Sequence, residues 1–443
     1  MWNEIRLSGW GRTSSARTRA ARPERAKDVD AAMAGSVGGT IVAHGAGRSY
    51  GDVALNDGGF TILTRRLNRF LDFDPGSGEV VVEPGVTFRD LITALLPQGF
   101  LAPVSPGTAF TTIGGAIAND VHGKNHETCG TFGDHVKWVD LLLASGERRR
   151  VSPESDAGLF RATIGGLGLT GVITAACFPM TRVPSNAVRR EERRMANIDD
   201  FLAGFAEATA RSVPFTVGWI DGAASGASLG RGILELAWPS PVAAAAPRNR
   251  NLSVPFDFPS LALNSYSVRA FNEVYYRRIP RGGRERIVQL AIFLYPLDAI
   301  LQWNRIYGDR GFYQFQCVLP PEQGAKGLRR LLETISQSRG ASFLAVLKAM
   351  GRAGSGLMSF PAPGYTLALD FPRQPETLAL LRQLHRITLD YGGRVYLAKD
   401  ACMTAETCAE MYPRLENFRS TLGDLDPEGR ITSDLARRLR IRQ

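Results

Sequence analysis

Two glycine-rich stretches, about sixty residues apart, constrain this chain more than any other feature. Ser105–His126 reads SPGTAFTTIGGAIANDVHGKNH, and Ala43–Asp52 reads AHGAGRSYGD. Glycine tolerates positive φ and lets a ligand approach the backbone, and successive exposed N–H groups form concavities that bind anions. We therefore expect both stretches to be ligand-holding loops rather than structural turns.

Neither loop has the spacing of a standard nucleotide-binding motif. Gly45–Gly51 (GAGRSYG) and Thr112–Ala118 (TIGGAIA) fit neither GxxxxGK[ST] nor a GxGxxG that begins a helix. A third stretch, Gly166–Gly171 (GLGLTG), has GxGxxG by letter, but the residues after it are typical of a strand. A Rossmann site needs a helix there and an acidic residue at the end of the next strand. The sequence therefore argues against a Rossmann dinucleotide site.

The net charge and the distribution of arginines limit the classes of partner that the chain is expected to bind. The chain has 443 residues, enough for more than one domain, and a net charge of +10. Its arginines are scattered, and no helix-turn-helix, zinc-finger or aromatic RNA-binding pattern accompanies them. We therefore expect no nucleic acid partner. The positive charge is typical either of a solvated surface or of attraction to an anionic substrate or membrane surface.

Cysteine and histidine spacing indicates neither disulfides nor a metal. The five cysteines form no CxxC pair, which favours reduced thiols. His122, His126 and His135 lie close together in the sequence, but their spacing matches no zinc site. We therefore expect no metal ion.

No secretory or membrane-spanning segment is evident. The first residues, MWNEIRLSGWGRT, lack the apolar run that a signal peptide needs. The most apolar stretch, Ile287–Leu301, is interrupted by Gln289, Pro296 and Asp298 and is too short to span a bilayer. The sequence therefore predicts a cytoplasmic protein, or one that lies peripherally at the inner membrane.

Residues 1–184 have the pattern of a first domain built from short strands and turns. A helix is predicted over Phe88–Leu96, and another ends at Leu159–Ala162. Pro179–Pro184 is the predicted boundary with the next domain. Strands bounded by glycine, aspartate or proline are predicted at Thr40–Ala43, Phe60–Leu63, Glu79–Glu83, Val136–Ala144 and Val172–Phe178.

Residues 185–395 alternate long strands with amphipathic helices, which favours an antiparallel sheet with helices on one face. Ser240–Leu252 and Arg352–Gly356 are predicted to be mobile loops that gate the site. Residues 396–443 are polar with aromatic and basic positions, and we expect them to return to the first domain. The predicted strands are Phe215–Asp221, Gly232–Ala237, Gln289–Tyr295, Tyr313–Leu319 and Tyr365–Phe371, and the predicted helices are Ile198–Ala210, Ala325–Gln337 and Pro375–Tyr391.

Together, the three glycine-rich stretches resemble the FAD-binding domain of the vanillyl-alcohol-oxidase, or PCMH-type, flavoproteins in order, spacing and sequence. Within that superfamily the chain is most similar to the flavoprotein subunits of the decaprenylphosphoryl-β-D-ribose 2-epimerases. The resemblance implies an α+β fold, with a PCMH-type FAD-binding domain and a substrate-binding cap domain. The stretches that carry it span nearly the full length: Arg6–Thr13, Asp120–His126, Trp303–Gly308, Tyr396–Asp400, Thr404–Arg414 and Ser433–Leu439.

The resemblance implies that Gly45–Tyr50 and Gly107–Gly115 wrap the FAD pyrophosphate with backbone amides. Many relatives have a histidine that bonds covalently to the flavin where this chain has Arg48. Arginine cannot form that bond, so we expect FAD to be held non-covalently. The expected cofactor-binding residues are Gly45, Ala46, Gly47, Arg48, Ser49, Tyr50, Pro106, Gly107, Thr108, Thr112, Ile113, Gly114, Gly115, Ala118, Asn119, His122, Gly168, Ile173, Tyr396, Ala398 and Lys399.

By the same resemblance, Lys399, His122 and Tyr50 are the expected catalytic residues. Oxidation of a carbinol needs a hydride acceptor, and it needs help in removing the hydroxyl proton and holding negative charge. Lys399, in YLAKD, suits the second task because a buried lysine changes protonation readily. The expected substrate contacts are Gln314, Gln316, Lys348 and Trp219, with Lys348 placed to meet a phosphate.

One residue departs from the family pattern. Relatives often have a cysteine on the strand before DFP, where this chain has Ala368. Hydride chemistry does not need that cysteine, so we expect Ala368 to change only the shape of the pocket.

The function implied by the resemblance is FAD-dependent oxidation of the 2-hydroxyl of a polyprenyl-phosphoryl-β-D-ribose to the 2-keto sugar. A separate NAD(P)H-dependent short-chain reductase then completes the epimerisation to the arabinose. One alternative is a soluble sugar, alditol or aldonolactone oxidase on the same fold that uses oxygen, since fold does not fix substrate. Another is a non-catalytic protein that binds anionic ligands.

Overall fold

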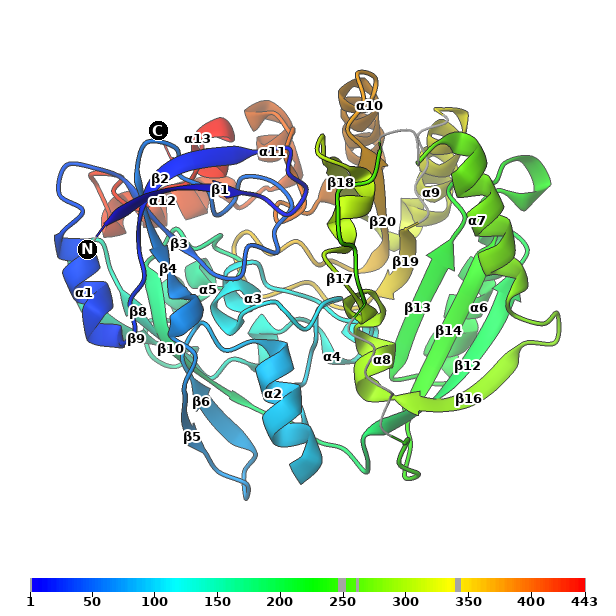
Figure 1. The fold of residues 1–443 in the computed structure, drawn as a ribbon, viewed down its shortest axis with the longest axis horizontal. Helices are drawn as coiled ribbons and strands as arrows, with labels where there is room; N and C mark the ends of the chain where they lie inside the picture. The colour runs from blue at the N-terminus through cyan, green and yellow to red at the C-terminus, as the bar shows by residue number, and fades with distance from the viewer. Residues whose placement is uncertain (1, 246–251, 260–262, 339–343, 443) are drawn as a thin grey trace.

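Two bodies of β-sheet lie side by side, and the C-terminal helices contact both of them (Figure 1). The computed structural model describes residues 2–245, 252–259, 263–338 and 344–442. Helices and sheets both contribute to each body, so the predicted α+β class is confirmed.

The first body contains a mixed sheet and an antiparallel sheet. The mixed sheet has the order β1-β2-β4-β3, and the antiparallel sheet has the order β5-β6-β10-β8-β9. A short pair, β7 with β11, adds to them. The strands are β1 Asn3–Ser8, β2 Ser15–Ala21, β3 Ile41–His44, β4 Phe60–Leu63, β5 Phe70–Phe73, β6 Glu79–Val82, β7 Phe100–Leu101, β8 Trp138–Leu142, β9 Arg148–Val151, β10 Val172–Pro179 and β11 Thr181–Arg182.

Five short helices complete this body. Helix α2 begins where the side chain of Thr87 accepts from Asp90 N and the Asp90 carboxylate accepts from Thr87 N, which forms a capping box. Its buried face, Phe88, Leu91 and Leu95, repeats at helical spacing, so the predicted helix there is confirmed. The helices are α1 Ala26–Ala34, α2 Phe88–Leu95, α3 Ile113–Ala118, α4 His126–Cys129 and α5 Ala157–Thr163.

The second body is built on an eight-stranded antiparallel sheet, with the order β16-β12-β14-β13-β19-β20-β18-β21. A parallel pair, β15 with β17, lies beside it. The strands are β12 Ala187–Met195, β13 Phe215–Ile220, β14 Gly232–Pro239, β15 Leu252–Ser253, β16 Arg284–Gln289, β17 Ile300–Leu301, β18 Phe312–Leu319, β19 Ala345–Met350, β20 Gly364–Pro372 and β21 Arg394–Val395.

The two faces of this sheet have different partners. Helices α6 (Ile198–Ala210), α9 (Pro321–Gln337) and α10 (Thr377–Asp390) share one hydrophobic cluster with Phe315 and Cys317 of β18. Because side chains alternate along a strand, Gln314 and Gln316 point to the opposite face, where they line a cavity. Helix α7 (Ser265–Arg277) covers another part of that opposite face.

One predicted strand is wrong. Gln289–Tyr295 was expected to be extended, but β16 ends at Gln289 and helix α8 follows at Leu290–Leu294. The buried residues of α8 are Leu290, Phe293 and Leu294. These three residues have helical spacing, which a run with few polar residues conceals.

The C-terminal segment contacts the first body at several points, and its helix α11 contacts α10 of the second body. Tyr50 N donates to Ala398 O, Thr432 N donates to Ile41 O, and Asp434 N donates to Leu55 O. The division of the chain at residues 184 and 395 stays a prediction. The segment contains the helices α11 Ala405–Met411, α12 Leu415–Leu425 and α13 Asp434–Arg438.

Arg438 joins three parts of the molecule. Its guanidinium makes two hydrogen bonds of 2.8 Å to the Asp52 carboxylate, and Nη1 lies 3.0 Å from Asp400 Oδ2. Asp400 also accepts from Cys402 N and Met403 N. The last helix therefore fixes both the loop after β3 and the turn that contains Lys399.

The two predicted gating loops have different outcomes. Arg352–Gly356 packs on the first body, where Arg352 pairs with Asp134, and no residue of the loop lines the cavity. Within Ser240–Leu252, residues 246–251 lie outside the described part of the chain. Among the described residues, no helix combines the length and apolarity needed to cross a membrane.

Candidate flavin and substrate site

One cavity of about 860 Å³ lies between the two bodies and the C-terminal segment. Its walls are the loops after β3 and β7, helix α3, the open face of β18–β20, and the turn after β21. All but two of the predicted site residues line it, namely Gly45, Ala46, Gly47, Arg48, Ser49, Tyr50, Pro106, Gly107, Thr108, Thr112, Gly114, Gly115, Ala118, Asn119, His122, Gly168, Ile173, Gln314, Gln316, Lys348, Tyr396, Ala398 and Lys399.

The two exceptions are Ile113 and Trp219. Ile113 is fully buried in the core of the first body and points away from the cavity. Trp219 lies on the open face of the eight-stranded sheet, but its ring centroid is 4.7 Å from that of Tyr275 on α7. Helix α7 thus covers Trp219, which the structure leaves outside the cavity.

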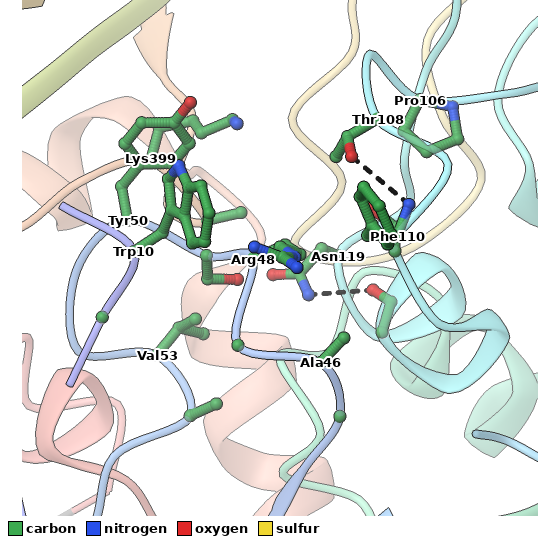
Figure 2. A pocket seen from close by; sticks show the side chains of 18 of the residues that line it. Trp10, Ala46, Arg48, Tyr50, Val53, Pro106, Thr108, Phe110, Asn119 and Lys399 are labelled. Carbon is green, nitrogen blue, oxygen red and sulfur yellow. Dashed lines mark hydrogen bonds between the residues drawn. The ribbon is translucent and has the colours of Figure 1, made fainter. Parts of the chain in front are cut away.

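Lys399 and Tyr50 are in contact at one end of the cavity. The Lys399 Nζ lies 4.0 Å from the centroid of the Tyr50 ring, in a cation–π arrangement that Figure 2 shows from close by. Burial lowers the pKa of Lys399 to about 8, opposed by the charge of Asp370. Burial also raises the pKa of Tyr50 well above its usual value, so the phenol stays protonated. Lys399 therefore changes charge close to physiological pH.

His122 lies in a wall of aromatic rings. Its ring centroid is 5.5 Å from those of Phe360 and Tyr396, and its Nε2 lies 3.0 Å from Gln316 Nε2. Burial lowers its pKa well below the usual value, and the nearby charges of Lys348, His126 and Lys399 lower it further. His122 is therefore neutral in this structure.

Lys348 is the second buried lysine of the cavity. It lies on β19, and its Nζ is 3.5 Å from Gly123 O. Burial lowers its pKa to about 7, and the charges of Lys124 and Lys399 act in the same direction. An anion in the cavity would raise the pKa of Lys348 again, because it would stabilise the charged form of the lysine.

Comparisons with known proteins identify the fold family. Residues 18–152 match the family model of the FAD binding domain, and residues 366–439 match that of D-arabinono-1,4-lactone oxidase. The decaprenylphosphoryl-beta-D-ribose oxidase of Mycolicibacterium smegmatis is 36% identical over 98% of this chain and 97% of its own length. The chain belongs to the decaprenylphosphoryl-β-D-ribose oxidase family. It is an FAD-dependent oxidoreductase that acts on CH–OH groups.

Two further relatives are similar to most of this chain. A Streptomyces coelicolor protein encoded in the mprA 5′ region is 32% identical over 80% of this chain and the whole of its own length. An L-gulono-1,4-lactone dehydrogenase of Mycobacterium tuberculosis is 24% identical over 92% of each chain. The family fold is thus shared with enzymes named for sugar lactones.

The loops of this decaprenylphosphoryl-β-D-ribose oxidase family member fit FAD. Gly47 has φ +62°, and no backbone N–H from Ala46 to Ser49 donates to another group in the described part of the chain. A Cβ at Gly107 or Gly168 would meet no heavy atom within 4 Å, so both backbones border open space. These loops therefore offer free N–H donors and room for the anionic pyrophosphate.

Unpartnered polar atoms point to a ligand in the same place. Arg48 Nε, Asn119 Oδ1 and His122 Nδ1 are buried and, among the described residues, have no hydrogen-bond partner. All three residues line the cavity. Buried polar groups are seldom left unpaired, so the three atoms are the expected contacts of a polar cofactor and substrate.

Arg48 is held by two aromatic rings. Its guanidinium carbon lies 4.2 Å from the Trp10 ring centroid and 5.0 Å from that of Phe110, as Figure 2 shows. Burial lowers the pKa of Arg48, and the carboxylate of Asp298 raises it. The side chain is a fixed cation beside the FAD loops and offers no imidazole for a covalent link.

One wall of the cavity has no residue among those expected from the sequence. Residues 297, 298 and 300–305 of the second body line the cavity. Asp298 anchors this segment by accepting from Thr108 Oγ1 and Ala109 N, both at 2.7 Å. Trp10, which lies in the RLSGWGRT stretch, was missed as well. Stacking of this kind has no sequence spacing that predicts it.

The structure also shows what Ala368 does. It lies directly opposite Gln316 in the β18–β20 pair, and it lines the cavity. Its methyl group leaves room beside Gln316 where relatives often have a cysteine. That Ala368 changes only the shape of the pocket stays a prediction.

Proposed function

We propose that this protein oxidises the 2-hydroxyl of a polyprenyl-phosphoryl-β-D-ribose to the 2-keto sugar. The observation that carries the proposal is the single cavity, which joins the FAD loops to Lys399 at one end and to Lys348 on the sheet. The family relative in Mycolicibacterium smegmatis is named for oxidation of such a lipid-linked ribose. FAD, when bound, accepts a hydride from a carbinol carbon.

The residues of the chain supply position and charge. Lys399, as an ammonium, stabilises the negative charge that develops on the substrate oxygen. The contact with the Tyr50 ring holds the ammonium in position. His122 and Gln316 are hydrogen-bonded to each other and line the cavity, and they hold the sugar ring with their remaining polar atoms. Lys348 pairs with the phosphate. The negative phosphate stabilises the Lys348 ammonium, which burial alone disfavours.

Two partners belong to the proposal. A separate NAD(P)H-dependent short-chain reductase takes the 2-keto product to the arabinose. A lipid-linked substrate also requires that the protein meet a membrane surface, peripherally. The apolar side chains of Leu252, Phe256 and Ile300 support such contact, since they are exposed on and beside the β15–β17 pair at the cavity wall.

The test is anaerobic reduction of the bound flavin, followed at its visible absorption, by a panel of polyprenyl-phosphoryl pentoses and free sugars. Bleaching by the lipid-linked ribose alone supports the proposal. Lys399→Ala should slow bleaching by about 10²- to 10⁴-fold and keep FAD. Lys326→Ala, at an exposed position on α9, is the matched control. Full bleaching rate in Lys399→Ala would remove the lysine from the mechanism.

A second candidate is oxidation of a free sugar, alditol or aldonolactone with oxygen. The match of residues 366–439 to the D-arabinono-1,4-lactone oxidase model favours it. Release of hydrogen peroxide with free alditols or lactones, and no bleaching by the lipid-linked ribose, would establish it. A colourless purified protein would instead support a non-catalytic binding role.

A further inference from the structure

A buried carboxylate, Asp370, lies behind the substrate wall and has no role in the proposed function. It sits on β20 with no exposed surface. Within the described residues, no basic side chain pairs with it at 4 Å or less. Burial of an unpaired carboxylate is costly, so the fold keeps this group for a reason other than stability.

Asp370 is hydrogen-bonded to a residue of the cavity. It lies directly opposite Gln314 in the β18–β20 pair, and Gln314 Nε2 donates to Asp370 Oδ1 at 2.5 Å. The Tyr307 hydroxyl lies 3.5 Å from the other carboxylate oxygen. Gln314 also lies close enough to the Tyr50 side chain to lower the pKa of its hydroxyl, against the larger effect of burial. A chain of polar groups thus runs from Asp370 through Gln314 to Tyr50 at the cavity.

The charge of Asp370 fixes which way the Gln314 amide points. An ionised carboxylate only accepts hydrogen bonds, so the NH₂ group of Gln314 must face it. The Gln314 carbonyl oxygen then faces the cavity, where it accepts from a hydroxyl. A protonated Asp370 can donate as well as accept, so the orientation of the amide is no longer fixed and its NH₂ can face the cavity. The same residue therefore offers an acceptor or a donor according to one charge behind it.

Asp370 also acts on Lys399. The charge of Asp370 opposes the effect of burial on the pKa of the Lys399 ammonium. The ring on which Lys399 rests belongs to the same cluster, since Tyr50 packs on Phe312 and Phe312 stacks on Tyr307. The titratable groups that act on Asp370 are Lys399, Tyr307 and, through Gln314, Tyr50.

We propose that Asp370 is a positioning residue of this site, which turns the Gln314 carbonyl oxygen toward the substrate hydroxyl and keeps Lys399 charged. The effect on the substrate hydroxyl rests on the proposed function. The effect of Asp370 on the charge of Lys399 concerns this chain alone. Burial raises the pKa of Asp370 to about 7. Below that pH the carboxyl becomes protonated and no longer fixes the Gln314 amide, so acid should weaken the site before it unfolds the protein. Lys399 stays charged in acid, so its dependence on Asp370 appears only above about pH 7.

The test uses Asp370→Asn, which keeps the shape and removes the charge. The chain has only six lysines, so reductive ¹³C-methylation and NMR can follow each ammonium, with Lys399 assigned by the signal lost in Lys399→Arg. In the FAD-loaded protein, the titration midpoint of Lys399 should fall by about one pH unit in Asp370→Asn. Asp390→Asn, at an exposed position at the end of α10, is the control and should cause no shift. An unchanged midpoint in Asp370→Asn would overturn the proposal.

A second variant tests the amide and covers the case in which Asp370→Asn does not fold. Gln314→Met cuts the chain of hydrogen bonds but leaves the carboxylate. The Lys399 midpoint should then stay as in the wild type, while KM for the reducing sugar rises about tenfold or more. An unchanged KM would overturn the amide part. If no sugar reduces the flavin at all, the proposed function fails, and the lysine titration still decides the role of Asp370.

Discussion

The Nε2 atoms of Gln316 and His122 lie 3.0 Å apart, and this pair requires His122 to be a neutral acceptor. The amide nitrogen of glutamine always carries hydrogens, so the imidazole Nε2 must be without one. The proton of the neutral ring then lies on Nδ1, which is buried without a partner among the described residues. The pair therefore presents one N–H donor to whatever ligand occupies the cavity.

The tautomer gives the first prediction. The His122 ring should keep its Nδ1–H form from pH 8 down to pH 5.5, since burial and three nearby basic groups lower its pKa well below 6.5. ¹⁵N NMR of histidine-labelled protein measures this directly, with His122 assigned by its loss in His122→Phe. A protonated ring at pH 6 would contradict the arrangement.

Acid treatment should release all of the FAD, because Arg48 leaves no imidazole at the position from which relatives link the flavin. After precipitation with trichloroacetic acid, the yellow colour is expected in the supernatant and none in the pellet. Flavin that stays with the pellet would show a covalent link elsewhere in the chain.

Lys348→Met should stabilise the protein. The folded-state pKa of Lys348 is lowered to about 7, whereas the unfolded value is about 10.4. The unfolded state therefore binds more protons between these values, and the penalty is full below pH 7 and vanishes near pH 10. Urea unfolding should show a gain on the order of 2 kcal/mol at pH 6.5 that shrinks by pH 9.5. The exposed Lys326→Met should show no such gain at either pH.

Arg438→Met should be strongly destabilising, because it leaves Asp52 and Asp400 buried without their cation. Loss of one partner from a buried pair costs about 3–5 kcal/mol. Chemical denaturation measures this, and Arg440→Met, at a residue paired only on the surface, should stay within about 0.5 kcal/mol of the wild type. Equal effects in the two variants would contradict the role of Arg438 as a clamp.

The sequence predicts the loops of the site better than its walls. Gly47 and Gly107 could be predicted because a glycine in the sequence itself indicates a positive φ or a close approach of a ligand to the backbone. Asp298 could not, since its partners Thr108 and Ala109 are almost two hundred residues away and no spacing links them.

Structural patterns are also hard to detect in the sequence of buried segments. In Leu290–Leu294 the helical repeat is masked because the neighbouring residues are apolar as well. Trp219 is expected in the site from the family resemblance, but only the folded chain shows that Tyr275 covers it. Asp370 was missed because a lone aspartate in a strand has no signature beyond its burial, which the sequence does not show.

The clamp made by Arg438 has a consequence for the order of events in synthesis. The loop after β3 is synthesised early and the turn at Asp400 late, and Arg438, which joins them, is synthesised later than both. A chain stopped before residue 438 lacks the tie between the two sides of the flavin pocket. The yellow colour of a preparation should therefore report how much of it has been translated past residue 438.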